Sequence, residues 1–297
     1  MPELDRYIPG VPCWIDTSQP DPEAAAAFYR DLFGWDIEDV MPHGAEGSYF
    51  MARIRGADVA GIGGVPEGAP PMAMWNTYVW VESADETAAK VKDAGGTVIT
   101  EPFDVMEAGR MAVFSDPEGA VFCVWQPNQH RGARIVNEPG SLNFNGLNTR
   151  DIDAAKAFYG AVFGWETLGL DGGALTWTLP GYGDHLERLN PGTRERMAAM
   201  GAVKGFEDVV ASILPIPADH VDMPAHWTVT FATEDADATA EKAIALGGKL
   251  LAPPFDAPWV RMTIIADPQG ATFIASQFAP ENRDVPAPGS ASVSASA

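Results

Sequence analysis

The sequence predicts an α+β fold of four successive units, each in the order strand, helix, three strands (βαβββ). Two repeated segments support this prediction. AFYRDLFGW at residues 27–35 returns as AFYGAVFGW at 157–165, and DPEGA at 116–120 returns as DPQGA at 267–271. Because both segments recur in the same order, the chain holds two copies of one module. Each copy contains two βαβββ units, expected at 11–65 and 74–127, and at 141–215 and 226–278.

Local patterns place the elements of the first copy. Asp21 and Pro22 fit the cap and first turn of a helix over 21–34, and Gly34 fits its end. A second helix, over 84–96, also ends on glycine. Apolar and alternating segments predict the strands, at 11–18, 35–40, 48–54, 58–65, 76–83, 97–105, 110–116 and 120–127.

The chain divides into an N-terminal extension (1–10), module 1 (11–129), a linker (130–140), module 2 (141–279) and a disordered tail (280–297). The tail is predicted from Pro, Ser and Ala without a hydrophobic pattern. Module 2 carries an insertion near 182–215, in which apolar residues recur every three positions and predict a helix over 193–214. This helix is either a lid over a ligand or a helix packed outside a sheet or on a partner chain.

Composition excludes several functional classes. The chain has 19 basic and 41 acidic residues and a net charge of −22, which excludes the basic surface of a nucleic-acid binder and disfavours an anionic membrane. Its 2 cysteines cannot build a disulfide framework or a four-cysteine zinc site. Residues 1–10 lack the pattern of a signal peptide, and no apolar run would span a bilayer. We therefore expect a cytoplasmic protein.

The motif D-x-E-x-A-x-x-F-Y-x-x-x-F-G-W, followed by ADETAAK at 84–90 and a late D-P-x-G-A, resembles the vicinal oxygen chelate superfamily. This superfamily includes glyoxalases, bleomycin-resistance proteins and extradiol dioxygenases. The chain looks most similar to its two-module glyoxalase-like members from actinobacteria. The resemblance implies tandem glyoxalase-like modules whose four βαβββ units form two curved mixed-sheet cups.

The resemblance also implies a divalent metal, held by His, Gln or Glu on the first, fifth and last strands of a module. The matching positions hold other residues: Trp14, Asn76 and Cys123 in the first copy, and Phe144, Thr228 and Ile274 in the second. Trp and Phe do not coordinate metals, and Asn with Cys makes a poor site. We therefore expect no conventional metal centre and no cofactor. A cluster of His185, Glu187 and His226 is the alternative.

The residues on the same strand faces suggest a ligand site. In the first copy the concave face would present Trp14, Asp16, Asn76, Tyr78, Trp80, Cys123 and Trp125. Large flat side chains suit an apolar or aromatic ligand, but they would equally fill the cup as core. The second copy presents smaller groups, which leave more volume: Phe144, Gly146, Asn148, Thr228 and Ile274.

Further candidates are charged. Arg110 and Arg261 occupy matched positions, where each would grip an anionic ligand or pair with Asp116 or Asp267 to lock a hairpin. Asp16, or the pair Asp184 and His185, would supply an acid and a base. GIGGV at 61–65 does not join a strand to a helix start and is not a nucleotide loop.

Two functions remain open. The first is binding of a small hydrophobic or aromatic metabolite, or an antibiotic-like compound, without the usual metal. The alternative is a glyoxalase-like lyase, isomerase or hydroxylase-associated enzyme, metal-dependent if unconventional ligands hold one. The partner is a small molecule rather than a nucleic acid or a membrane, and assembly into a homodimer is left open.

Overall fold

The computed structural model describes residues 6–42, 44, 46–170 and 174–286. The helices there are α1 (Pro22–Phe33), α2 (Ala84–Asp93), α3 (Ile152–Phe163), α4 (Tyr182–Leu189), α5 (Thr193–Ala199) and α6 (Ala236–Ala245). The strands of the first copy are β1 (Pro12–Gln19), β2 (Asp36–Asp39), β3 (Tyr49–Ile54), β4 (Ala57–Gly64), β5 (Met74–Trp80), β6 (Thr97–Val105), β7 (Gly109–Ser115) and β8 (Val121–Pro127). Those of the second copy are β9 (Leu142–Thr149), β10 (Glu166–Gly169), β11 (Leu175–Thr178), β12 (Val209–Pro215), β13 (His226–Ala232), β14 (Lys249–Ala257), β15 (Val260–Ala266) and β16 (Thr272–Phe278).

The element order confirms the α+β fold and the βαβββ units. Strands form two 8-stranded sheets, ordered β2-β3-β4-β1-β5-β8-β7-β6 and β10-β11-β12-β9-β13-β16-β15-β14. In each βαβββ unit the first strand pairs with the last in parallel, as β1 does with β4, and the other pairs within a unit are antiparallel. Both sheets are therefore mixed, as expected for a duplicated module.

The predicted helix over 193–214 is wrong beyond its first two turns. Helix α5 ends at Ala199, a short 3₁₀ helix covers Phe206–Asp208, and β12 begins at Val209. The segment VVASILP has the apolar, β-branched content of a buried strand, and Ser212 pairs with Gly146 of β9. In the predicted tail, Pro280–Asn282 forms a 3₁₀ turn, and 287–297 lie outside the described residues.

Contacts divide the chain into two compact units that do not follow the two copies. Unit I holds the residues up to Cys13, Thr77–Gly132 and Asn145–Trp227, and unit II holds Trp14–Asn76, Ala133–Phe144 and the residues from Thr228 onward. Each unit thus combines one βαβββ unit of the first copy with one of the second: the first and fourth in unit II, the second and third in unit I. The module boundaries given above remain predictions about the repeat.

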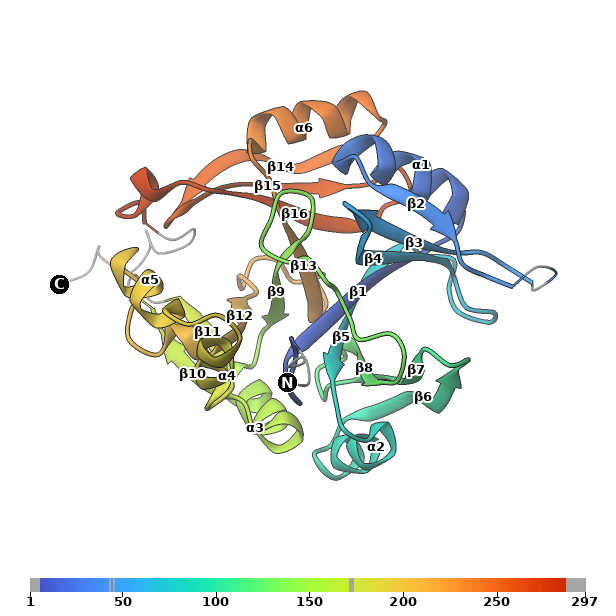
Figure 1. Cartoon of the computed structure of the whole chain (residues 1–297), viewed down its shortest axis with the longest axis horizontal. Helices are drawn as coiled ribbons and strands as arrows, with labels where there is room; N and C mark the ends of the chain where they lie inside the picture. The colour runs from blue at the N-terminus through green and yellow to red at the C-terminus, as the bar shows by residue number, and fades with distance from the viewer. Residues whose placement is uncertain (1–5, 43, 45, 171–173, 287–297) are drawn as a thin grey trace. The chain divides into compact units, whose positions relative to one another are not determined.

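Helix α1 of unit II shows how local sequence prepares this pairing. The Asp21 side chain caps the helix by accepting from Ala24 N, Pro22 opens it, and Gly34 ends it in the left-handed conformation at φ 72°. In Figure 1 α1 lies beside β2–β4, and α6 lies along β14 and β15. The apolar side of α1 contributes Phe28, Tyr29 and Leu32 to the core.

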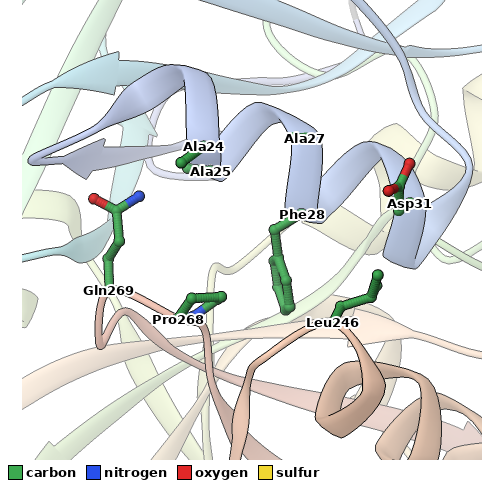
Figure 2. A pocket seen from close by; sticks show the side chains of 8 residues that line it. All are labelled: Ala24, Ala25, Ala27, Phe28, Asp31, Leu246, Pro268 and Gln269. Atoms are coloured by element: carbon green, nitrogen blue, oxygen red, sulfur yellow. The ribbon is translucent and has the colours of Figure 1, made fainter.

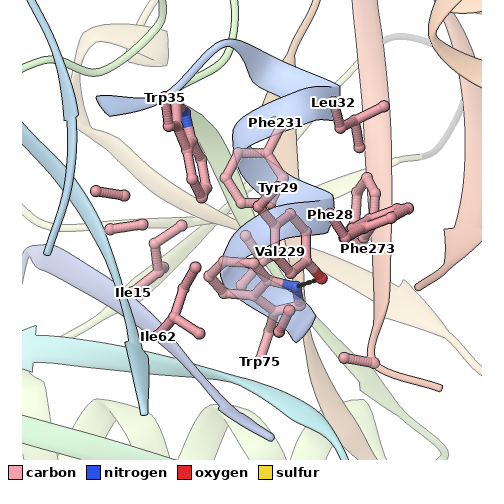
Figure 3. Close-up of a cluster of buried hydrophobic side chains, with 14 of the residues drawn as sticks. Ile15, Phe28, Tyr29, Leu32, Trp35, Ile62, Trp75, Val229, Phe231 and Phe273 are labelled. Carbon is pink, nitrogen blue, oxygen red and sulfur yellow. Dashed lines mark hydrogen bonds between the residues drawn. The ribbon is translucent and has the colours of Figure 1, made fainter. Parts of the chain in front are cut away.

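The core of unit II is an aromatic cluster drawn from both copies (Figure 3). Tyr29 and Trp75 of the first copy pack on Phe231 and Phe273 of the second, with ring centroids 5.1–5.9 Å apart. The Tyr29 hydroxyl donates to Asp267 Oδ2 at 2.9 Å. Because burial raises the pKa of Tyr29 well above its usual value, this phenol stays a donor.

Unit I repeats the arrangement with exchanged copies. Tyr159 on α3 of the second copy donates to Asp116 Oδ2 at 3.0 Å, and Asp116 belongs to the first copy. The indole of Trp165 donates to Gly10 O at 2.7 Å, as Trp35 does to Gly140 O at 2.8 Å in unit II. The Tyr and Trp of the repeated AFYxxxFGW segment thus join the two copies within each unit.

Candidate functional site

A hydrogen-bonded network in unit II joins several of the predicted site residues. Asp16 on β1 is only 8% exposed. Tyr49 Oη donates to Asp16 Oδ2 at 3.1 Å, and Asn76 Nδ2 donates to Asp16 Oδ1 at 2.9 Å. The same amide nitrogen donates to Ser18 Oγ at 3.1 Å, and Trp14 Nε1 donates to Tyr49 Oη at 3.3 Å. We call these five residues the Asp16 network.

Strand geometry explains why these residues meet. Trp14, Asp16 and Ser18 alternate along β1 and so share one face of the sheet. Asn76 and Tyr49 contribute from β5 and from the first residue of β3. The sequence predicted Trp14, Asp16 and Asn76 for this face, but it did not predict Tyr49.

The predicted aromatic residues of unit I are packed as core. Tyr78, Trp80, Cys123 and Trp125 are each 6% exposed or less. Trp125 Nε1 donates to His130 O at 2.8 Å, and its ring lies 6.4 Å from that of Tyr78. The sequence left open whether these aromatic side chains line a ligand site or fill the core, and this packing favours the core.

Trp80 in unit I is covered by two residues that flank the first copy, Tyr7 of the N-terminal extension and Arg131 of the linker. Tyr7 packs on it with ring centroids 6.0 Å apart, and the Arg131 guanidinium lies 5.6 Å from the ring centre. The Cys13 thiol of the same unit is fully buried, which raises its pKa and leaves it unreactive.

Of the residues predicted to line a ligand site in the second copy, unit I holds Gly146 and Asn148. A side-chain carbon at Gly146 would lie 2.7 Å from Ser212 Oγ and 3.0 Å from Leu214 Cδ1, so neighbours already occupy this space. Asn148 Nδ2 donates to His226 O at 3.3 Å. The small residue at 146 therefore does not provide the open volume expected there.

Unit II holds the other second-copy positions. Phe144 and Ile274 are half-buried, and Thr228 is buried. Thr230 pairs with Ile274 in the parallel β13–β16 ladder. Apart from the Thr228 hydroxyl, these three side chains offer no polar group to a ligand.

Arg110 and Arg261 form ion pairs, but not with the predicted partners. Arg110 donates to both oxygens of Asp85, at 2.8 and 3.0 Å, and to Asp104 at 3.0 Å. Arg261 bonds Asp237 and Asp256 in the same way. These contacts lower the pKa values of Asp85, Asp237 and Asp256.

The expected pairing of these arginines with Asp116 and Asp267 is wrong. Both carboxylates point inward, where they accept the hydroxyls of Tyr159 and Tyr29 and the backbone N–H groups of their own turns. Sequence proximity suggested the wrong partner because each aspartate bonds a helix of the other copy.

The structure does not bring together Asp184 and His185. The His185 ring is buried in unit I with Nε2 3.3 Å from Arg6 O, whereas Asp184 is exposed and pairs with Arg194 at 2.6 Å. Consecutive helical residues diverge by about 100°, so the pair cannot act on one point.

The alternative metal cluster is not assembled either. Glu187 accepts from Gly192 N at 2.6 Å, and His226 Nδ1 lies 2.8 Å from Pro224 O. Within the described ranges, no three His, Cys, Asp or Glu side chains are grouped closely enough to hold a metal ion.

The positions matching the family's metal ligands also have unsuitable chemistry. The indole nitrogen of Trp14 offers no lone pair to a cation, and Asn76 turns its NH₂ group to Asp16, which leaves a single neutral amide oxygen at that position. Phe144 and Ile274 carry no donor atom at all. The residues present therefore do not fit a His, Gln or Glu metal set.

Two surface pockets lie away from the Asp16 network. In unit II, a pocket of about 350 Å³ separates α1 from the β15–β16 turn (Figure 2), and is lined mainly by Ala24, Ala27, Phe28, Leu246 and Pro268. In unit I, a pocket of about 430 Å³ includes Arg110, Met106 and Gln126. The guanidinium in the second pocket is already bound by two carboxylates.

The family model "Glyoxalase/Bleomycin resistance protein/Dioxygenase superfamily" matches residues 14–124 and 141–274. The chain belongs to this superfamily. Both copies match, so the tandem glyoxalase-type modules expected from the repeat are confirmed.

Relatives of known name span almost the whole chain. The "Putative glyoxylase CFP32" of Mycobacterium tuberculosis is 40% identical over 286 residues, covering 95% of this chain and 100% of its own length. "Anthracycline biosynthesis protein DnrV" of Streptomyces peucetius is 35% identical over 285 residues, covering 91% and 94%.

Solved structures share the superfamily fold at low identity. The Mn(II)-bound glyoxalase of Novosphingobium aromaticivorans aligns with a TM-score of 0.56 at 16% identity, covering 92% of this chain and 83% of its own. The 2,3-dioxygenase LapB of Pseudomonas sp. KL28 aligns at 0.58 and 13%, covering 91% and 93%. In the described part of this chain, no helix is long and apolar enough to cross a bilayer.

Proposed function

We propose that the chain binds a small hydrophobic or aromatic metabolite, or an antibiotic-like compound, in its glyoxalase-type fold without the family's usual metal centre. The superfamily supports small-molecule binding or glyoxalase-like catalysis in general. The finer proposal rests on the Asp16 network. Where relatives would carry metal ligands, Trp14 and Asn76 are engaged as hydrogen-bond donors.

The network has the composition of a ligand site. It combines the flat faces of an indole and a phenol with a carboxylate, an amide and a hydroxyl, which together orient a planar molecule. Asp16 and Trp14 are buried, whereas Ser18, Tyr49 and Asn76 are half-buried and so reach the surface of the unit. The names of the Streptomyces relatives make an anthracycline-type compound one candidate ligand for this chain.

The test combines metal analysis with binding. The protein is purified without chelator in buffer containing Mn²⁺, Ni²⁺, Zn²⁺ and Fe²⁺, and its metal content is measured by mass spectrometry. We expect substoichiometric metal, and calorimetric binding of planar aromatic compounds that EDTA does not change. One metal ion per chain, required for that binding, would overturn the proposal.

Variants locate the binding. Trp14→Ala and Asn76→Ala should weaken it at least tenfold, since each removes a contact of the network. Trp259→Ala is the matched control, because Trp259 belongs to the turn between β14 and β15 and stacks on Phe278 of β16. Equal losses in all three variants would argue against this site.

Catalysis through Asp16 is the second candidate, favoured by one observation: a buried carboxylate accepts the hydroxyl of a phenol, as an acid–base pair requires. Asp16→Asn separates the two functions. Retained binding with lost turnover supports the enzyme, whereas unchanged turnover excludes Asp16 as its acid or base. The cytoplasmic location and assembly into a homodimer remain proposals.

A further inference from the structure

The glycine-rich segment GIGGV of β4 has a steric explanation in unit II. A side-chain carbon at Gly61 would lie 2.1 Å from Tyr49 Oη and 2.6 Å from Tyr49 Cζ. One at Gly63 would lie 3.0 Å from Tyr49 Cδ2. Gly61 and Gly63 alternate along the strand, so both bare backbone positions face the same ring. We call them the glycine seat.

Space, rather than backbone conformation, requires glycine at these positions. Neither Gly61 nor Gly63 has a positive φ, in contrast to Gly56 and Gly68 on either side. An alanine would therefore fit the strand backbone but not the Tyr49 ring. Gly64, the next residue, meets nothing within 4 Å and serves as an internal comparison.

The seat directs the phenol to Asp16. Gly61 pairs with Asp16 in the parallel β1–β4 ladder, and a carbon at Gly61 would lie 3.0 Å from Asp16 Cβ. A ring resting on Gly61 therefore has its hydroxyl at the carboxylate, where Tyr49 Oη donates at 3.1 Å. Trp14, two residues before Asp16 on β1, donates its Nε1–H to the same phenol oxygen.

The fixed carboxylate in turn sets the orientation of Asn76. The amide turns its NH₂ group toward Asp16, whose Oδ1 accepts from Asn76 Nδ2 at 2.9 Å. Both amide hydrogens are then used, on Asp16 and on Ser18. The carbonyl oxygen is the group of Asn76 that remains for a ligand, and it accepts from a hydroxyl.

The second copy lacks this arrangement. Gly146 stands where the first copy has Asp16, and Ser212 stands at the position of Gly61, since these two residues pair in the matching ladder. The seat and its tyrosine are therefore a feature of the first copy alone.

We propose that Tyr49, seated on Gly61 and Gly63, is a positioning residue that fixes Asp16 and, through it, the carbonyl oxygen of Asn76 for the hydroxyl group of a planar aromatic ligand. This inference rests on the proposed function and adds the chemical feature that the ligand must carry.

The seat is tested without any ligand by a double-mutant cycle on the full chain. Gly61→Ala should lower the melting temperature by several degrees, whereas Gly64→Ala should leave it unchanged. In the Tyr49→Ala background, Gly61→Ala should cause a much smaller loss, because the clashing ring is gone and only the 3.0 Å approach to Asp16 Cβ remains. Equal losses from Gly61→Ala with and without Tyr49 overturn the seat.

The positioning role is tested with two probes, 2-naphthol and 2-methoxynaphthalene, by calorimetry. Tyr49→Phe keeps the ring and removes the hydroxyl. It should weaken 2-naphthol binding about tenfold and change 2-methoxynaphthalene binding less than about twofold, because only naphthol donates to the oriented acceptor. Gly61→Ala should give the same pattern and Gly64→Ala should match the wild type.

The outcomes separate the two proposals. If both probes bind the wild type and Tyr49→Phe weakens them equally or not at all, the positioning role is overturned and the proposed function stands. If neither probe binds the wild type, both are overturned. A loss confined to 2-naphthol supports the inference, since a merely structural role would not distinguish the two probes.

Discussion

Replacing Trp177 by Phe should cost far less stability than replacing Trp165, although both lie in one cluster of unit I. The two indoles are 0% and 3% exposed, and their rings lie 5.6 Å apart. They differ in whether the indole nitrogen has a hydrogen-bond acceptor. Trp165 Nε1 donates to Gly10 O at 2.7 Å, whereas Trp177 Nε1 has no partner among the described residues.

The magnitude follows from this difference. Each Trp→Phe change removes the same atoms from a buried site, at a common cost of about 1–2 kcal/mol. In Trp165→Phe the buried carbonyl of Gly10 also loses its donor, which costs a further ~1–3 kcal/mol. In Trp177→Phe an unsatisfied donor disappears, which offsets part of the common cost. We expect the two variants to differ by about 2–4 kcal/mol in the free energy of unfolding.

Urea denaturation followed by far-ultraviolet circular dichroism measures this difference. Trp35→Phe is the matched control in unit II, because its indole donates to Gly140 O at 2.8 Å and is 1% exposed. It should behave like Trp165→Phe. Equal destabilisation of all three variants would refute the reasoning, since the shared loss of volume would then explain everything.

Two more predictions concern the turns that join the copies. Gln269→Glu should destabilise the chain by about 1 kcal/mol, because Gln269 Nε2 donates to Asp21 O at 2.7 Å and a carboxylate cannot donate this hydrogen bond. Gln277→Glu is the control in the same denaturation assay. It should be tolerated, because the Gln277 side chain accepts from Ala236 N at the start of α6 and a carboxylate can do the same. Burial raises the pKa of Asp116, so the folded chain binds more protons than the unfolded chain between the ordinary and the raised pKa. Its contribution to stability should fall as the pH rises through that window and stay constant above it. Asp116→Asn should remove this dependence in unfolding curves measured from pH 3.5 to 7.

The strands and the first two helices were predictable because their signals are local. Asp21, Pro22 and Gly34 act within a few residues of one helix, and alternation along a strand needs only its own sequence. The structure of the insertion was harder to predict. Apolar residues recur every three positions beyond the end of α5, but the residues of β12 form a strand because they pair with β9.

Contacts between distant residues were not predictable in the same way. DPEGA and DPQGA were recognised as repeated segments, but not as contacts between the copies. Asp267 Oδ2 accepts from Tyr29, 238 residues away, and Asp116 Oδ2 accepts from Tyr159, 43 residues away. Tyr49 was missed because nothing near it in the sequence points to Asp16. The glycines of GIGGV were the available signal, because glycine leaves room for a neighbouring side chain. The sequence does not say which side chain occupies that room.

The exchanged pairing has a consequence for each copy alone. A chain of residues 1–140 contains Tyr29 and Trp75 but lacks Phe231, Phe273 and Asp267, so the core of unit II is incomplete in it. Its own second βαβββ unit carries the equivalents Phe122 and Asp116, which face α3 of the other copy in the full chain. We therefore expect 1–140 to fold only by associating, either with 141–297 or with a second 1–140.

Light scattering combined with near-ultraviolet circular dichroism measures mass and side-chain packing together. Mixing the two halves should restore a cooperative unfolding transition without the covalent linker. A folded monomer of 1–140 would contradict the argument, because one copy would then close a core that the structure builds from two.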